Sequence, residues 1–187
     1  MSLDTPPEES FDGTALTVGI VAARFNPRMV DGLLHNCVQV LLENNVGRDR
    51  IQIVRVPGSN EIPYAASMLA NSGDYDVLIG LGLVMAGETP HHEVIVNSTG
   101  LAMQQIGIQT EVPVINGIVV VHTAEQAEAR CLGAINRGRE FGLAALEMGL
   151  LGQQLVDQLN DIADALEELE GEGPWDGMSN QGDPWKL

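Results

Sequence analysis

Basic residues are scarce in this chain: nine lysines and arginines stand against 26 aspartates and glutamates, and the formal net charge is -17. The only lysine is Lys186, close to the end of the sequence, so Schiff-base catalysis is excluded from the globular part. A field of this sign repels phosphate backbones and argues against nucleic acid as a partner. An anionic small substrate would therefore need an arginine placed beside it.

Cysteines and aromatic residues are also few. The two cysteines, Cys37 and Cys131, fit a reducing cytosol better than a disulfide framework, and we expect both to be buried as small hydrophobic residues. Aromatic residues make up 4% of the chain, so the core should consist of aliphatic layers. The N-terminus shows no secretory leader, and no apolar run approaches the roughly 18 residues of a membrane span. These absences predict a soluble, cytoplasmic protein that does not bind membranes.

Apolar segments and helical patterns alternate along the chain. We expect strands at residues 15–23, 51–56, 76–85 and 112–121. The helices expected after them cover residues 29–45, 61–69 and 91–109 and a segment that begins after Thr123 as N-cap. This order requires right-handed crossovers and predicts an α/β fold in which a four-stranded parallel sheet lies between helices on both faces. At 187 residues the chain forms one domain, placed at 15–151 after a flexible N-terminal arm of residues 1–14.

Four loops follow the carboxyl ends of these strands, where open parallel sheets bind ligands. They comprise residues 24–27, 57–60 and 86–90 and the segment past Val121. Because the strands are parallel, their carboxyl ends meet at one edge of the sheet. We therefore expect the four loops to face one crevice.

The stretch LVMAGETPHHE, residues 83–93, combines an anion-binding turn with ionisable side chains. Gly87 permits a backbone turn closed to other residues, and Pro90 suits the first turn of a helix carrying His91. The N-terminus of a helix attracts anions through its free N–H groups and its dipole. His91 and His92 can exchange protons near neutral pH. A glycine turn between strand and helix is also ordinary in α/β proteins, so the stretch alone leaves a structural role open.

The end of the chain has a different pattern. Helical spacing continues from residue 143 to 169, and leucine or isoleucine recurs at steps of four, three, four and three at Leu155, Leu159, Ile162, Leu166 and Leu169. This heptad-like pattern covers about two repeats, fewer than a convincing coiled coil needs. A long last helix laid on the domain surface or on a neighbouring subunit is the favoured alternative.

Residues 152–187 therefore form an acidic C-terminal extension. Its end, residues 170–187, is rich in glycine, proline and aspartate, a composition typical of a flexible tail. Trp175 and Trp185 lie in this tail, each after a proline. Aromatic residues kept out of the core can dock on a partner, whose identity the sequence does not give.

Six motifs in a fixed order resemble one family. They are ARFN at 23–26, VPGSNEIP at 56–63, GETPH at 87–91, PVINGIVVVHTAEQAEAR at 113–130, NRG at 136–138 and ALEM at 145–148. From about Val18 to Leu151 the chain resembles 6,7-dimethyl-8-ribityllumazine synthase. That family joins 5-amino-6-(D-ribitylamino)uracil to 3,4-dihydroxy-2-butanone 4-phosphate in riboflavin biosynthesis. The resemblance implies a flavodoxin-like three-layer sandwich and a transferase with no metal and no cofactor.

The resemblance also assigns roles to residues. His91 would transfer protons. The phosphate would be bound by the loop of Gly87, Glu88 and Thr89 and by the cation of Arg130. For the ribitylaminouracil, the resemblance implies that Phe25 stacks on the pyrimidine ring and that Asn116 lines the ring pocket. The ribityl chain would be hydrogen-bonded by Ser59, Asn60 and Glu61. Backbone groups for the ring would come from Leu83, Val84 and Met85. Without the resemblance, Glu61 would be read as a helix-start charge, Arg130 as a solvated residue and Phe25 as a cover over the core.

Three positions depart from the family pattern. Asn60 stands where an aromatic residue is frequent, Ala86 where a basic residue is common, and His92 where phenylalanine is common. Ala86 weakens the local field for phosphate, and Asn60 changes the wall beside the ribityl chain. The family assembles as pentamers or pentamer-based icosahedral shells whose active sites are shared between neighbouring subunits, so the resemblance implies a homo-oligomer.

Two other functional classes stay open from the sequence. One is a cage or scaffold protein derived from the family, with weak or no catalysis, whose acidic extension recruits partners. The other is a flavin-binding protein, although GLGLVMAG at 80–87 lacks the spacing of a dinucleotide fingerprint.

Overall fold

A computed structural model describes the backbone of residues 11–171 and the side chains of residues 11–167. The first ten residues of the expected N-terminal arm and most of the expected tail, residues 172–187, lie outside the described part. The rest of that arm is attached to the domain. The backbone N–H of Phe11 donates to Oδ1 of Asn44 (3.2 Å), and the N–H of Gly13 donates to the carbonyl of Asn44 (2.7 Å).

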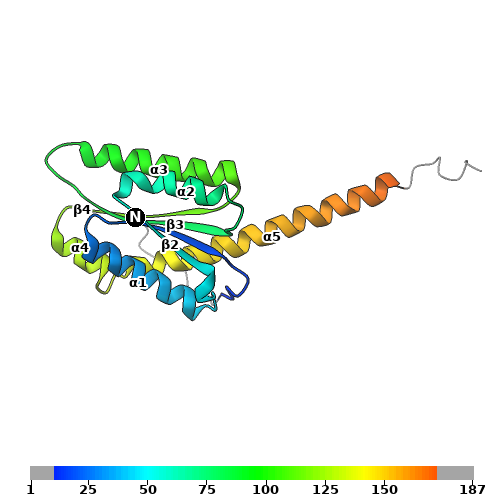
Figure 1. Cartoon of the computed structure of the whole chain (residues 1–187), viewed down its shortest axis with the longest axis horizontal. Coiled ribbons are helices and arrows are strands. Elements are labelled where there is room, and N and C mark those ends of the chain that lie inside the picture. Colours follow the sequence, from blue (N-terminus) through cyan, green and yellow to red (C-terminus); the bar gives the residue numbers. More distant parts are fainter. Residues whose placement is uncertain (1–10, 172–187) are drawn as a thin grey trace, which may run out of the picture. The chain divides into compact units, whose positions relative to one another are not determined.

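The sheet has four strands, all parallel, in the order β2-β1-β3-β4. Their bounds are β1 Val18–Ala23, β2 Ile51–Val56, β3 Val77–Met85 and β4 Val114–Val121. Seen in Figure 1, the strands lie between two layers of helices. The predicted four-stranded parallel α/β sandwich is thereby confirmed.

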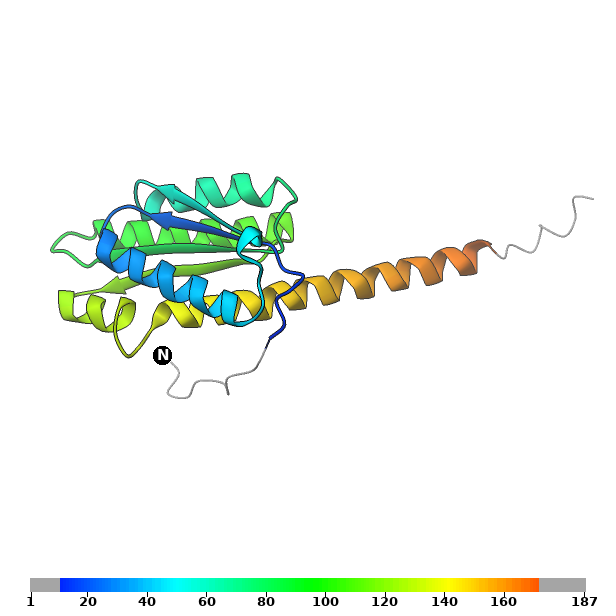
Figure 2. The ribbon, with the colours of Figure 1, turned by 60° about the horizontal axis from the view of Figure 1, so that its bottom comes forward.

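Helices cover both faces of the sheet. The α-helices are α1 Pro27–Glu43, α2 Ile62–Ala70, α3 His91–Thr110, α4 Ala124–Cys131 and α5 Arg137–Gly171, and two short 3-10 turns are η1 Arg48–Arg50 and η2 Ser59–Glu61. Helices α2 and α3 lie on one face, and α1, α4 and the start of α5 lie on the other (Figures 1 and 2). Each face has its own cluster of buried aliphatic residues. Strand β3 lies at the centre, and eight of its nine residues are buried.

Several element boundaries differ from the sequence expectation. Strand β1 begins at Val18 rather than at residue 15, because a turn closed by the bond from Leu16 N to Gly13 O precedes it (2.9 Å). The last helix begins at Arg137 rather than near 143. Asn136, with φ of 42°, caps it by accepting on Oδ1 the N–H of Arg139 (3.2 Å). The predicted cap at Thr123 is confirmed, since its Oγ1 accepts the N–H of Gln126 (3.2 Å).

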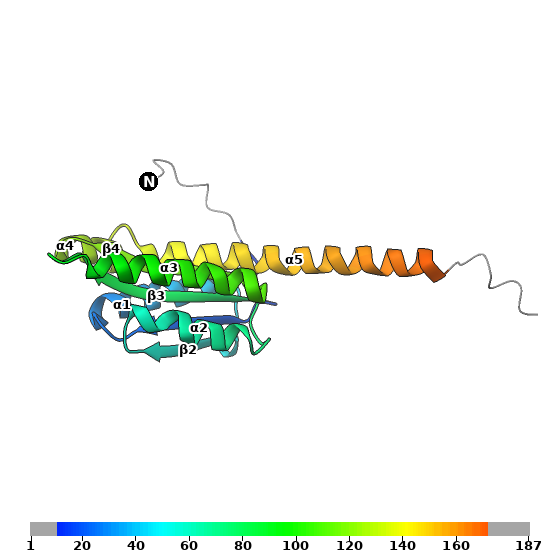
Figure 3. The ribbon, with the colours of Figure 1, turned by 90° about the horizontal axis from the view of Figure 1, so that it is seen from above.

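By its internal contacts the chain divides into two compact units, Met1–Gly152 and Gln153–Leu187. In the first unit the aliphatic residues buried between the sheet and its helices form the two clusters described above. In the second unit the described part is the rest of α5, drawn in orange in Figure 3. Within the described residues, no helix is both long and apolar enough to cross a membrane.

We predict that neither cysteine reacts with a thiol reagent at neutral pH while the protein is folded. Cys37 and Cys131 are free and fully buried, as expected, and burial raises the pKa of the Cys37 thiol to about 12 and that of Cys131 to about 11. The thiolate is the reactive form, and it is absent under these conditions. An aromatic disulfide reagent, which releases a coloured thiolate when a cysteine reacts with it, should give colour only after urea unfolds the protein. Prompt modification of either residue in native protein would contradict the buried environment.

Candidate functional site

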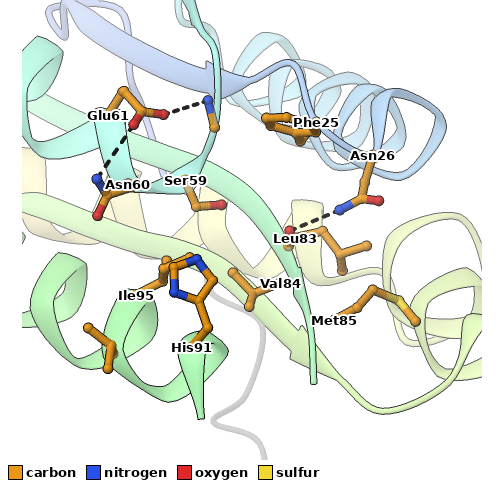
Figure 4. Close-up of a pocket in the computed structure, with 12 residues that line it drawn as sticks. Phe25, Asn26, Ser59, Asn60, Glu61, Leu83, Val84, Met85, His91 and Ile95 are labelled. Carbon is orange, nitrogen blue, oxygen red and sulfur yellow. Dashed lines mark hydrogen bonds between the residues drawn. The ribbon is translucent and has the colours of Figure 1, made fainter. Parts of the chain in front are cut away.

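A cavity of about 470 Å³ lies at the carboxyl edge of the sheet, within the range of roughly 300–1,000 Å³ found for small-molecule sites. It is formed by the loops after β1 and β2, the end of β3 and the start of α3 (Figure 4). The lining residues are Phe25, Asn26, Gly58, Ser59, Asn60, Glu61, Leu83, Val84, Met85, His91, Val94 and Ile95. Eight of the thirteen residues singled out from the sequence are thus brought together.

The polar wall of the cavity is the short turn η2. One oxygen of Glu61, Oε2, accepts the backbone N–H of Gly58 (2.8 Å), while Oε1 accepts from Nδ2 of Asn60 at 3.5 Å. The carboxylate therefore stabilises its own turn and also faces the cavity. The reading of Glu61 as a helix-start charge is confirmed by the bond from Gly58. Its expected contact with the ribityl chain stays a prediction.

Ser59 is fixed by its close approach to the central strand. Its side chain is buried, and a Cβ added at Gly82 of β3 would lie 2.4 Å from Ser59 Oγ. No residue other than glycine leaves room at that position without moving the serine. The glycines of β3 thus serve side-chain packing.

Asn26 is a lining residue to which sequence reasoning gave no role. Its backbone is left-handed, with φ of 55°, a conformation that asparagine tolerates better than most residues. Its Nδ2 donates to the carbonyl of Leu83 (3.1 Å), which ties the loop after β1 to the end of β3. The N–H of Phe25 donates to Pro57 O (3.1 Å), so the ring, 72% exposed, is presented at the cavity by a fixed backbone.

The end of β3 presents backbone groups to the cavity because it extends past its neighbour. Pairing of β1 with β3 stops at Ala22 and Leu81, whereas β3 continues to Met85. The N–H groups of Leu78 and Ala86 bond toward β4 (2.8 Å each), so even-numbered residues of the strand direct their backbone there.

The odd-numbered residues Leu83 and Met85 therefore turn their backbone groups toward the open edge, and Leu83 O already holds Asn26 there. Val84 directs its backbone to β4 and lines the cavity with its side chain. We expected the Val84 backbone to contact the substrate ring; the structure corrects this expectation, because that backbone is directed to β4.

The two adjacent histidines have different surroundings. His91, in the first turn of α3, lines the cavity, and its ring points toward the hollow that also holds Ser59 and Asn60 (Figure 4). His92 has Nδ1 2.9 Å from the carbonyl of Thr89. A carbonyl only accepts hydrogen bonds, so this nitrogen carries the proton and donates. His92 thus closes the loop before α3, and His91 is the imidazole that faces the cavity.

The loop that was expected to bind phosphate does not line the cavity. Gly87, Glu88 and Thr89 are exposed and are not among the lining residues. The prediction of a turn that only glycine permits was wrong, because Gly87 does not have positive φ; among the described glycines only Gly73 does. Pro90 precedes the helix instead of forming its first turn. Its carbonyl accepts the first helical bonds, from Glu93 N (3.0 Å) and Val94 N (3.3 Å).

Asn116 and Arg130 lie away from the cavity of their own chain. Asn116 is an exposed residue of β4, and its Oδ1 accepts the N–H of Ile118 (3.1 Å). Arg130 is in α4, in the other helix layer, and donates to Gln126 O (3.3 Å). No arginine or lysine lines the cavity. Within residues 11–167, no three histidine, cysteine or acidic side chains are grouped to hold a metal ion.

A parallel sheet with an aromatic ring, a polar turn and an imidazole around a cavity at its carboxyl edge defines an α/β protein with an enzyme-like small-molecule site. The model of the 6,7-dimethyl-8-ribityllumazine synthase family matches residues 15–153. The chain therefore belongs to the 6,7-dimethyl-8-ribityllumazine synthase family.

Curated relatives with that name come from distant organisms. The protein of Xanthomonas euvesicatoria is 41% identical over 136 residues, 72% of this chain and 88% of the relative. That of Cupriavidus pinatubonensis is 41% identical over 152 residues, covering 81% and 89%. That of Thermococcus onnurineus is 39% identical over 148 residues, covering 79% and 96%. The family resemblance read from the motifs is confirmed, and the scaffold and flavin-binding alternatives are not favoured.

We predict that alanine substitution destabilises the protein at Gly82, where the surroundings are crowded, and not at Gly87, where they are open. Gly82→Ala forces Ser59 away from β3 and should lower the free energy of unfolding by about 1–3 kcal/mol, as overpacking does. Gly87→Ala is the matched control. Nothing lies within 4 Å of its added Cβ, so its stability should stay within about 0.5 kcal/mol of the parent. Urea unfolding measures both, and equal effects would contradict the close contact at Gly82.

Proposed function

We propose that this protein is an active 6,7-dimethyl-8-ribityllumazine synthase, a transferase of riboflavin biosynthesis. It condenses 5-amino-6-(D-ribitylamino)uracil with 3,4-dihydroxy-2-butanone 4-phosphate and releases phosphate and water. The observation that carries the proposal is the cavity, which combines the Phe25 ring, the polar turn at 59–61 and His91 in a chain of this family.

The ribitylaminouracil fits the half of the cavity formed by β1, η2 and β3. The Phe25 ring offers a flat surface on which a pyrimidine stacks. Backbone groups of Leu83 and Met85 at the open edge of β3 suit the polar edge of the ring. Ser59, Asn60 and Glu61 supply hydroxyl, amide and carboxylate groups for a polyhydroxyl chain, and with Asn60 this wall is polar where relatives often have an aromatic side chain.

The phosphorylated substrate fits the start of α3. The first N–H groups of a helix have no partner within it and favour an anion. The side chains here cannot hold the phosphate, because the Glu88 carboxylate repels it and Ala86 supplies no charge. Backbone amides near Gly87, Glu88 and Thr89 would hold it instead. A guanidinium from Arg130 would complete the site by its fork of donors.

His91 lies between the two substrate positions and moves protons during imine formation, phosphate elimination and ring closure. General acid–base help of this kind contributes about 10²- to 10⁴-fold. Holding the two reactants together contributes a large further part of the rate.

The assembly we propose is a homo-oligomer in which Asn116 and Arg130 serve the cavity of a neighbouring subunit. Two observations support it: both residues lie away from their own cavity, and helices α2 and α3 expose large apolar side chains, among them Tyr64, Met68 and Ile108. Exposed apolar groups of this size are typical of a subunit interface. A pentamer, alone or in an icosahedral shell, located in the cytoplasm, is the form that family membership favours.

We predict that His91→Asn lowers the rate of lumazine formation by about 10²- to 10⁴-fold, because it removes the proton-transferring group. His92→Phe is the control, since His92 bonds to the loop and phenylalanine is common there in the family. Its rate should stay within about tenfold of the parent, the cost of one lost neutral hydrogen bond. Product absorbance, corrected for the spontaneous reaction, measures both rates. Parent protein no faster than the spontaneous reaction would contradict the proposed function.

We also predict that two inactive variants complement each other. In mixed rings of Arg130→Ala and His91→Asn chains, co-expressed in equal amounts, about a quarter of the sites would pair an intact His91 with an intact neighbouring Arg130. The mixture should therefore recover about a quarter of parental activity, while each variant alone stays low. Absence of recovery in confirmed mixed assemblies would place both residues in one chain's site, or show that Arg130 is not used.

A further inference from the structure

The C-terminal extension carries an apolar surface of its own. In the second compact unit, which begins at Gln153, five large apolar side chains are between 50% and 66% exposed on helix α5. They are Leu155, Val156, Leu159, Ile162 and Leu166; we call them the extension stripe. In proteins most of the stability of a helix comes from packing of its apolar face, so this surface needs a cover.

The extension stripe follows a heptad register. With Leu155 at position d, Leu159 and Leu166 occupy a positions and Ile162 the next d. The e and g positions are uncharged: Val156, which belongs to the stripe, and Gln158, Ala163 and Ala165. The acidic residues fall at b, c and f, on the opposite side of the helix: Asp157, Asp161, Asp164 and Glu167.

This charge pattern identifies the occupant. A basic partner helix would need acidic residues at the e and g positions that flank the stripe, and there are none. A second copy of the same segment meets only apolar and neutral side chains, while every carboxylate of both copies stays in solvent. Since three of the four e and g residues, Val156, Ala163 and Ala165, are small or apolar, the face is wider than an a/d seam and leaves room for more than two copies.

The stripe also lies outside the family domain. The family model ends at residue 153, and the second compact unit begins at that same residue. Catalysis by the domain therefore does not explain the pattern.

We propose that residues 153–167 pack through the extension stripe against the same segment of other copies of this chain, forming a helical bundle that adds to the contacts of the domain. The inference does not depend on the proposed reaction. Its chemistry is burial of the leucine and isoleucine side chains between chains, with the acidic face outward.

Cysteine cross-linking in the full-length chain tests the proposal. Leu159→Cys places a thiol at an a position of the stripe, and Asp161→Cys, two residues away, places one on the acidic face. Both share the same local concentration in any oligomer, so mild oxidation should yield covalent dimers of Leu159→Cys at least about tenfold faster. The unchanged protein, with Cys37 and Cys131 buried, should give none. Equal rates for the two variants, or no cross-link from Leu159→Cys, would overturn the proposal.

Hydrogen exchange gives a second, independent readout. Amides of residues 153–167 should exchange slowly in the parent protein. In Leu155→Ser/Ile162→Ser they should exchange at least about tenfold faster, because the packed face that stabilises the helix is lost. The matched control Asp157→Ser/Asp164→Ser changes the acidic face at the same spacing and should keep the protection. Rapid exchange in the parent, or equal loss in both variants, would show that no copy covers the stripe.

Discussion

The bond between the Asn26 side chain and the Leu83 carbonyl is the constraint on which the site depends. Strand β3 extends past β1, and a parallel ladder that ended there would leave unpaired backbone groups at the sheet edge. Asn26 satisfies one of them and holds the loop with Phe25 beside the end of β3. The left-handed backbone at Asn26 makes this reach possible. The cavity is the space that remains between this loop, the turn η2 and the start of α3.

Positive charge is what the cavity of one chain lacks. The protein has a formal net charge of -17 and binds an anionic substrate in our proposal, yet no arginine or lysine lines the cavity. Backbone amides at the start of α3 supply part of the positive potential without adding a charged residue. In the proposed function the rest comes from Arg130 of a neighbouring subunit, a residue that in its own chain lies in the other helix layer. The proposed function thus links assembly to catalysis through electrostatics. His92, by contrast, bonds to the loop before α3.

Much of the fold was predictable because apolar runs such as residues 77–85 are typical of central parallel strands, and because Thr123 is a strong helix cap. The predicted boundaries of helices were wrong where a local side-chain hydrogen bond sets the end of the element, as the Asn136 cap does at the start of α5. Residues that share a loop motif, such as Ser59 to Glu61, were predictable as a group. The task of Asn26, the glycine requirement at Gly82 and the direction of the Val84 backbone were not, since each depends on a contact between segments distant in sequence.

The sequence by itself determined the α/β class, the family and the set of residue types at the strand ends, because periodicity and ordered motifs are local properties. It also determined that the extension has an apolar face and an acidic face. Only the tertiary structure decided which residues share one cavity, that His91 rather than His92 faces it, and that Asn116 and Arg130 point elsewhere. The physical reason is that strand register and helix docking place these groups, and both are set by packing of the whole core.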